Sequence, residues 1–149
     1  MAHRLSVMFE ARSMAVIGAS ARPGSFGARL AAATVSRDFQ GRIDFINPRG
    51  GEILGHRALG HISELDHAPD VAILGVGATN LEQALLDAID KGARSAVIFD
   101  SCQGKTADGT LLLQRLKDIA CEADLPVCGG SGMGFISTRS GAVASFYPS

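Results

Sequence analysis

Residues 14–27 decide the fold of this chain, and they read Met14-Ala15-Val16-Ile17-Gly18-Ala19-Ser20-Ala21-Arg22-Pro23-Gly24-Ser25-Phe26-Gly27. A short apolar run ends in a loop rich in Gly, Ser and Pro, and the loop opens onto residues 28–33, a strong helix former. A strand, a glycine-rich loop and a helix in this order suit a phosphate group, because backbone N–H groups of the loop and the helix N-terminus point at the anion. The stretch therefore indicates a ligand of the nucleotide type.

The spacing of the glycines separates this loop from the common nucleotide fingerprints. A dinucleotide-binding loop places its glycines as G-x-G-x-x-G, whereas here they stand further apart, at Gly18, Gly24 and Gly27. No Gly-Lys-Ser/Thr follows, so the loop is not a Walker loop either. A βα turn whose glycines serve geometry alone remains an alternative.

Composition places the chain among ordinary globular domains. Its 149 residues are 46% hydrophobic and 19% charged, which suffices for one domain with a real core. No apolar run approaches the roughly 20 residues of a membrane span, and the first residues lack the apolar core of a signal peptide. The net charge of −1 argues against a nucleic-acid surface. We therefore expect no membrane and no nucleic-acid partner.

The three cysteines favour a reducing environment and no metal site. They are odd in number and match no metal-ligand spacing: Cys102, Cys121 and Cys128. A cytoplasmic location is the corresponding expectation.

Apolar strands alternate with amphipathic helices along the chain. Strands are predicted at 13–18, 42–46, 71–76, 95–99 and 126–128, and helices at 26–39, 81–91 and 110–123. Strands that are apolar throughout indicate a sheet covered on both faces. The predicted fold is α/β, a Rossmann-like doubly wound parallel sheet of about five strands with helices on both faces.

Two stretches fit this alternation less well. Residues 50–65 read as an excursion between the second and third strands, with a helical turn near its end. The Gly- and Ser-rich end shows no clear period. We predict a domain over 1–134, followed at 135–149 by a linker or cut edge toward a second domain.

Ligands of open α/β sheets bind beyond the carboxyl ends of the strands. After the second strand, an NAD site would place Asp or Glu, but this chain has Arg49, which suits a phosphate on the ribose. A solvated surface arginine is the alternative. After the third strand, Gly75, Val76 and Gly77 would let a flat ring approach the backbone, while Thr79 or Asn80 is expected to cap the next helix.

The chain shows few candidates for catalysis. Cys102 follows the fourth strand near a helix start, where its pKa could fall, but a bystander thiol is the preferred interpretation. Cys121 and Cys128 are expected in the core. The four histidines fall away from the strand ends and are interpreted as surface or turn residues: His3, His56, His61 and His67. We predict a domain that binds a ligand and has no catalytic residue of its own.

The order of these motifs resembles a known family. The matching stretches are residues 5–27, 46–49, 53–55, 65–72, 92–98 and 129–135. Together they resemble the N-terminal CoA-binding domain of the NDP-forming (ADP-forming) acyl-CoA synthetases, relatives of the succinyl-CoA synthetase α-subunit. The resemblance covers nearly the whole chain in order, which makes it more specific than any single loop.

The resemblance implies coenzyme A as the ligand. The loop after the first strand would face its phosphates, with Gly18, Ala19, Ser20, Arg22, Gly24, Ser25, Phe26 and Gly27. The ribose would lie by Asn47, Pro48 and Arg49, with Arg49 near the 3′-phosphate. Gly75, Val76 and Gly77 would flank the adenine end, and Asp100, Ser101 and Cys102 would lie along the pantetheine arm.

The resemblance also implies an acid–thiol ligase reaction, in which an acid, CoA and a nucleoside triphosphate react through an acyl phosphate and a phosphohistidine. In the family the phosphorylated histidine and the ATP-grasp domain lie outside this domain, so they would act on it in cis or in trans. The late motif departs from the family at Ser131 and Gly132, where relatives usually carry Asn and then Cys or a similar residue. A stand-alone CoA-binding regulatory protein and an NADP-binding domain of a dehydrogenase or redox sensor remain as alternatives.

Overall fold

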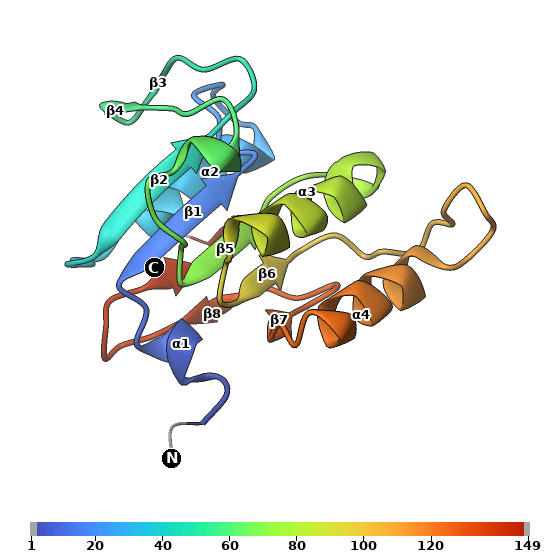
Figure 1. Cartoon of the computed structure of the whole chain (residues 1–149). Helices are drawn as coiled ribbons and strands as arrows, with labels where there is room; N and C mark the ends of the chain where they lie inside the picture. Colours follow the sequence, from blue (N-terminus) through green and yellow to red (C-terminus); the bar gives the residue numbers. More distant parts are fainter. Residues whose placement is uncertain (1–2, 148–149) are drawn as a thin grey trace.

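The computed structural model of the chain describes residues 3–147. Its centre is a parallel sheet in the order β2-β1-β5-β6-β7 (Figure 1). The strands are β1 (Ser13–Ile17), β2 (Arg42–Ile46), β5 (Val71–Leu74), β6 (Ala96–Ile98) and β7 (Val127–Cys128). The predicted fold class is confirmed, and the strands agree with prediction except for one or two residues at their ends.

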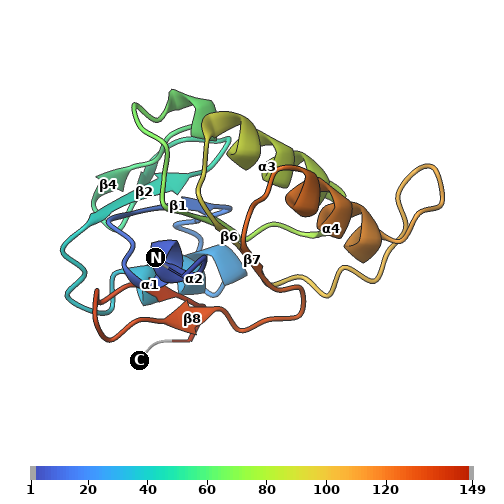
Figure 2. The same ribbon diagram turned by 60° about the horizontal axis from the view of Figure 1, so that its bottom comes forward.

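The strand order reverses at β1. β2 pairs with one side of β1, and β5 pairs with the other. Helix α2 (Phe26–Thr34) follows β1 and covers one face of the sheet, while α3 (Ala78–Lys91) and α4 (Leu112–Glu122) cover the opposite face (Figure 2). The chain therefore has a topological switch point at the carboxyl ends of β1 and β5, where ligands of such sheets bind.

The core consists of one apolar cluster on each face of the sheet. On the side of α3 and α4 it includes Leu74, Leu81, Leu85, Ile98 and Leu116. On the side of α2 it includes Met14, Val16, Leu30, Phe45 and Ala144. The central strands contribute side chains to both clusters, which explains why these strands are apolar throughout.

The helices differ from prediction mainly at their ends. Helix α3 starts earlier than predicted, because Gly77 is its N-cap and neither Thr79 nor Asn80 has that role. Helix α2 stops at Thr34, where Thr34 Oγ1 donates to the carbonyl of Ala31, and such local bonds compete with helix continuation. No helix within residues 3–147 is long and apolar enough to cross a bilayer.

The excursion after β2 is confirmed and has structure of its own. It contains a small hairpin of β3 (Glu52–Ile53) and β4 (His56–Arg57), followed by the 3-10 turn η1 (Ile62–Glu64). Ile53 is buried and anchors the hairpin to the side of the sheet that carries α2. Leu59 forms a parallel bridge with Ile46, which brings the end of the excursion back to the carboxyl end of β2.

The two ends of the described chain meet on the α2 face. Helix α1 (Ser6–Phe9) precedes β1, and an antiparallel pair, β8 (Phe135–Ile136) and β9 (Val143–Ala144), closes the chain. Val143 is fully buried, and Ser137 Oγ donates to the carbonyl of Phe9. Residues 135–147 thus pack on the domain, whereas a linker or cut edge was predicted over 135–149, whose last two residues lie outside the described range. A domain that follows them remains a prediction.

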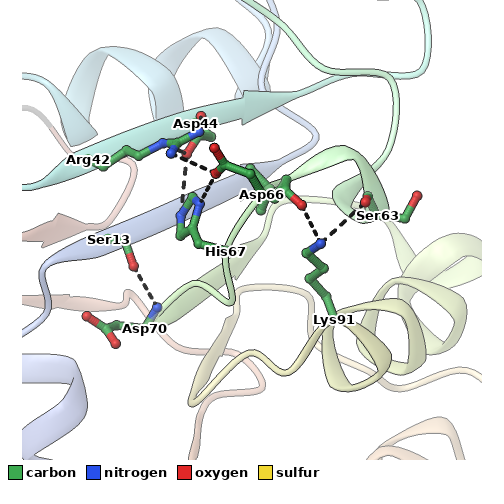
Figure 3. A network of polar contacts seen from close by, with 9 residues as sticks. Ser13, Arg42, Asp44, Ser63, Asp66, His67, Asp70 and Lys91 are labelled. Atoms are coloured by element: carbon green, nitrogen blue, oxygen red, sulfur yellow. Dashed lines mark hydrogen bonds and ion pairs between the residues drawn. The ribbon is translucent and has the colours of Figure 1, made fainter.

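A polar network ties the sheet together toward its amino end (Figure 3). Arg42 Nε lies 2.9 Å from Asp44 Oδ2, and its Nη1 lies 2.8 Å from Asp66 Oδ1. His67 Nδ1 is 2.9 Å from the same oxygen of Asp66. The hydrogen bond from His67 and the charge of Arg42 hold the pKa of Asp66 below its ordinary value. Among the described residues, His67 Nε2 is buried without a hydrogen bond and lies 3.8 Å from Asp44 Oδ2, while the other contacts of the network link β2 to the segment before β5.

Candidate ligand-binding site

Two glycines give the loop after β1 its shape. Gly18 has φ +87°, and a Cβ there would stand 2.3 Å from the carbonyl oxygen of Gly75. A Cβ on Gly27 would stand 2.2 Å from the carbonyl oxygen of Gly18. The loop therefore lies directly between the end of β5 and the first turn of α2, and only glycine permits either approach.

The polar residues of the loop organise the start of α2. Ser25 is the N-cap: its Oγ accepts from Ala28 N at 3.1 Å and donates to the carbonyl of Arg22 at 2.7 Å. Ser20 Oγ accepts from Arg22 N at 3.0 Å. The first turn of α2 contains no acidic residue, so its N–H groups and dipole present positive potential to an anion.

The loop after β2 is joined to the loop after β1. Asn47 Nδ2 donates to the carbonyl of Ala19 at 3.0 Å, and Asn47 Oδ1 accepts from Arg49 N at 2.9 Å. Within residues 3–147, the side chains of Arg22 and Arg49 make no ion pair, and both residues are exposed. The loops after β1 and β2 thus carry two arginines without ion pairs among the described residues, and these arginines suit the phosphates of a ligand.

A cleft of about 280 Å³ lies beside this loop, at the switch point of the sheet. Its apolar lining comes from Ile17, Ile46, Pro48, Ile62 and Val76. Its polar side chains are His61, Asn80, Gln83 and Asp87. Aliphatic walls with a polar rim next to an anion site suit a flat heterocycle that carries phosphates.

The structure places three of the predicted site residues in the lining of this cleft. They are Gly18, Pro48 and Val76, and Asn47 links the two loops beside it. Gly75 lies behind it, because a Cβ there would stand 2.4 Å from Leu30 Cδ2 in the core. Phe26 does not face the cleft, because its ring packs against Phe99 and Phe146 on the α2 side of the sheet.

His61 corrects the expectation that all four histidines lie away from the site. The excursion folds back at Leu59, so Gly60 and His61 form one wall of the cleft. His61 Nε2 lies 2.9 Å from Asp87 Oδ2 on α3. No sequence signal marks this residue, because its position depends on the return of the excursion to β2.

The loop after β6 lies outside the cleft. Cys102 N donates to Asp100 Oδ2 at 2.8 Å, and the thiol donates to the carbonyl of Asp100. Burial, aided by the charge of Asp100, raises the pKa of the Cys102 thiol, which agrees with a bystander cysteine. Cys121 is exposed on α4, so its predicted place in the core is wrong.

A larger hollow, of about 790 Å³, lies at the opposite, amino end of the sheet. Two of its arginines, Arg42 and Arg139, are already paired with carboxylates, Arg139 with Glu10 at 3.0 Å. Within residues 3–147, no three His, Cys, Asp or Glu side chains are grouped to hold a metal ion. The carboxyl edge is therefore the better candidate for a nucleotide.

Comparison with known families matches residues 12–138 to the model of the CoA binding domain. The chain belongs to this family. Among curated relatives of this CoA-binding domain, the subunit alpha of acetate–CoA ligase [ADP-forming] I from Pyrococcus furiosus is 28% identical over 149 residues, covering 97% of this chain and 32% of the relative. Acetate–CoA ligase [ADP-forming] II from Archaeoglobus fulgidus is 28% identical, covering 93% and 21%. The resemblance inferred from the motifs is thus confirmed, and the domain spans at most about a third of these relatives.

Solved structures share the fold of the domain. The dinucleotide-forming acetyl-coenzyme A synthetase 1 of Ca. Korarchaeum cryptofilum, in complex with phosphate and ADP, superposes with a TM-score of 0.85 at 24% identity. The match covers 97% of this chain and 31% of that one. A hypothetical protein from Pyrococcus horikoshii OT3 gives a TM-score of 0.67 at 18% identity, covering 87% and 83%. The same fold therefore occurs both within long synthetase chains and in a chain of similar size.

Proposed function

We propose that the cleft at the switch point binds coenzyme A. The observation that carries the proposal is the juxtaposition of an anion-binding loop with an aliphatic cleft, in a chain of the CoA binding domain family. The adenine would lie in the cleft near Pro48 and Val76, and the diphosphate would face Gly18 and the N-terminus of α2. The pantetheine arm would run past Asp100, Ser101 and Cys102.

We further propose that the domain serves acyl-CoA formation from an acid, CoA and a nucleoside triphosphate. Its relatives include several ADP-forming acetate–CoA ligases and a trans-feruloyl-CoA synthase. The phosphohistidine and the ATP-grasp domain would be supplied by other domains, in cis or in trans. The domain holds CoA, and the transfer chemistry belongs to its partners.

The proposal is tested by calorimetric titration of the chain with CoA, dephospho-CoA, NADH and NADPH in parallel. We expect CoA to bind most tightly, because Arg49 and the loop after β1 offer positive groups for three phosphates. Tighter binding of NADPH than of CoA would contradict the proposal and favour a dinucleotide site. Absence of binding by all four ligands would contradict it as well.

The variant Arg49→Ala tests which phosphate this arginine contacts. We expect CoA to bind roughly 10- to 150-fold more weakly, as for loss of a charge-assisted bond of about 1.5 to 3 kcal/mol, and dephospho-CoA to bind as before. Arg139→Ala removes the same charge at the opposite end of the sheet and should leave both affinities unchanged. Equal losses for CoA and dephospho-CoA would remove Arg49 from the 3′-phosphate.

A further inference from the structure

The imidazole of His61 joins the two walls of the cleft. Its Nδ1 lies 3.1 Å from the backbone N of Ser63 and 2.8 Å from Ser63 Oγ. This is the N-cap bond of η1. Its Nε2 lies 2.9 Å from Asp87 Oδ2 on α3. One ring thus caps the turn on one side of the cleft and contacts the helix on the other.

These contacts define the protonation state that fits the site. A backbone N–H can only donate, so Nδ1 of His61 must accept from Ser63 N. The ring proton then resides on Nε2 and donates to the Asp87 carboxylate. The neutral ring with its proton on Nε2 satisfies both contacts.

Asp87 is held on both of its oxygens. Gln83 Nε2 donates to Asp87 Oδ1 at 2.8 Å, while His61 contacts Oδ2. Burial alone would raise the pKa of Asp87, but the hydrogen bonds from His61 and Gln83 outweigh it and keep the pKa below its ordinary value. Asp87 therefore stays a carboxylate, and the position of its head, like that of Gln83, depends on His61.

A second link between the turn and the helix comes from Lys91. Its Nζ donates to the carbonyls of Ser63 and Leu65, as Figure 3 shows. Glu64 of η1 accepts from Gly60 N, and Asp87 is the charged group that His61 contacts. Lys91 does not line the cleft, so His61 is the side chain that joins η1 to α3 at the cleft.

We infer that His61 is a positioning residue of the nucleotide cleft, one that holds η1 against α3 and aims Asp87 and Gln83 at the ligand. The inference rests on the proposed function, because it names a residue that positions the walls of the same site. Loss of the imidazole would remove the cap of η1 and the partner of Asp87 together, so the two walls of the cleft would no longer be joined by this side chain.

The test measures CoA affinity for the wild type, His61→Asn, His61→Ala and His3→Asn. Asparagine can cap η1, whereas alanine can neither cap it nor contact Asp87. We expect His61→Ala to bind CoA about three- to tenfold more weakly than the wild type, as for loss of one cap. His61→Asn should recover part of that loss, and His3→Asn should bind as the wild type does.

Wild-type affinity in His61→Ala would overturn the inference, as would an affinity of His61→Asn no better than that of His61→Ala. Nitrogen-15 NMR of the histidine rings gives a readout that needs no ligand. We expect His61 to carry its proton on Nε2 at pH 8, and a proton on Nδ1 would overturn the inference. Failure of the wild type to bind CoA would instead contradict the proposed function, and the NMR result would still decide the role of the ring.

Discussion

At the scale of single residues, the site depends on backbone approaches that a side chain would prevent. Gly18 combines a left-handed backbone with a contact to Gly75 that leaves no room for a Cβ. Gly24 has a similar φ, +75°, but a Cβ there would meet nothing within 4 Å. Comparison of the two positions therefore separates the cost of backbone strain from the cost of a steric clash.

We predict that Gly18→Ala destabilises the fold more than Gly24→Ala does. The left-handed backbone costs about 1 to 2 kcal/mol for a non-glycine residue, and this alone applies to Gly24→Ala. In Gly18→Ala the clash with the Gly75 carbonyl adds to that cost and moves the loop away from β5. Urea unfolding of both variants gives the free energies of unfolding. Similar losses in the two variants would mean that the loop adjusts to the extra methyl group.

Residue spacing was sufficient to predict the loop but not the whole cleft. The glycines and Ser25 act locally, on the strand end and helix start next to them in the chain, so their roles can be read from their order. His61, Gln83 and Asp87 come from two elements that meet only in the folded domain. Their contribution could not be predicted, because nothing in their local sequence differs from a surface turn and a helix face.

At the scale of elements, the C-terminal segment shows how burial gives structure to a sequence without a clear period. Residues 142–144 are fully buried, although their neighbours are Gly, Ser and exposed polar residues. β8 and β9 contain two residues each, too few for alternation to show in the sequence. Packing against α2 therefore determines the structure of β9, which the local sequence pattern does not indicate.

We predict that Val143→Ala destabilises the domain by about 1 to 3 kcal/mol, as for loss of two buried methyl groups and the cavity they leave. Ile136→Ala provides the matched control on the paired strand, because Ile136 is 43% exposed. Its effect should stay within about 0.5 kcal/mol of the wild type. Chemical denaturation measures both. Unchanged stability in Val143→Ala would mean that the packing of β9 contributes little to the free energy of unfolding.

At the scale of the whole molecule, the reversal of strand order creates the site. The loops after β1, β2 and β5 meet at the switch point, and they come from both sides of β1. Helices α2 and α3 lie on opposite faces, so a ligand there contacts both layers of the fold. Binding should therefore stabilise the domain as a unit.

We predict that saturating CoA raises the melting temperature of the domain. At a concentration 100 times Kd, a ligand that binds only the folded state adds about 2.7 kcal/mol, which corresponds to roughly 5 to 10 °C for a domain of this size. Differential scanning calorimetry with and without CoA measures the shift, with NADH at the same concentration as the control. A shift of equal size with NADH would point to nonspecific binding of anions.

The sequence by itself determined the fold class, the order of strands and helices along the chain and the loop that suits a phosphate. It could do so because these features depend on periodicity and on glycine spacing between neighbours in the chain. The tertiary structure alone decided the return of the excursion to β2, the pairing of His61 with Asp87 and the packing of β9 on α2. Those contacts join residues far apart in the chain, and their free energy arises from burial and hydrogen bonding that exist only after the layers have assembled.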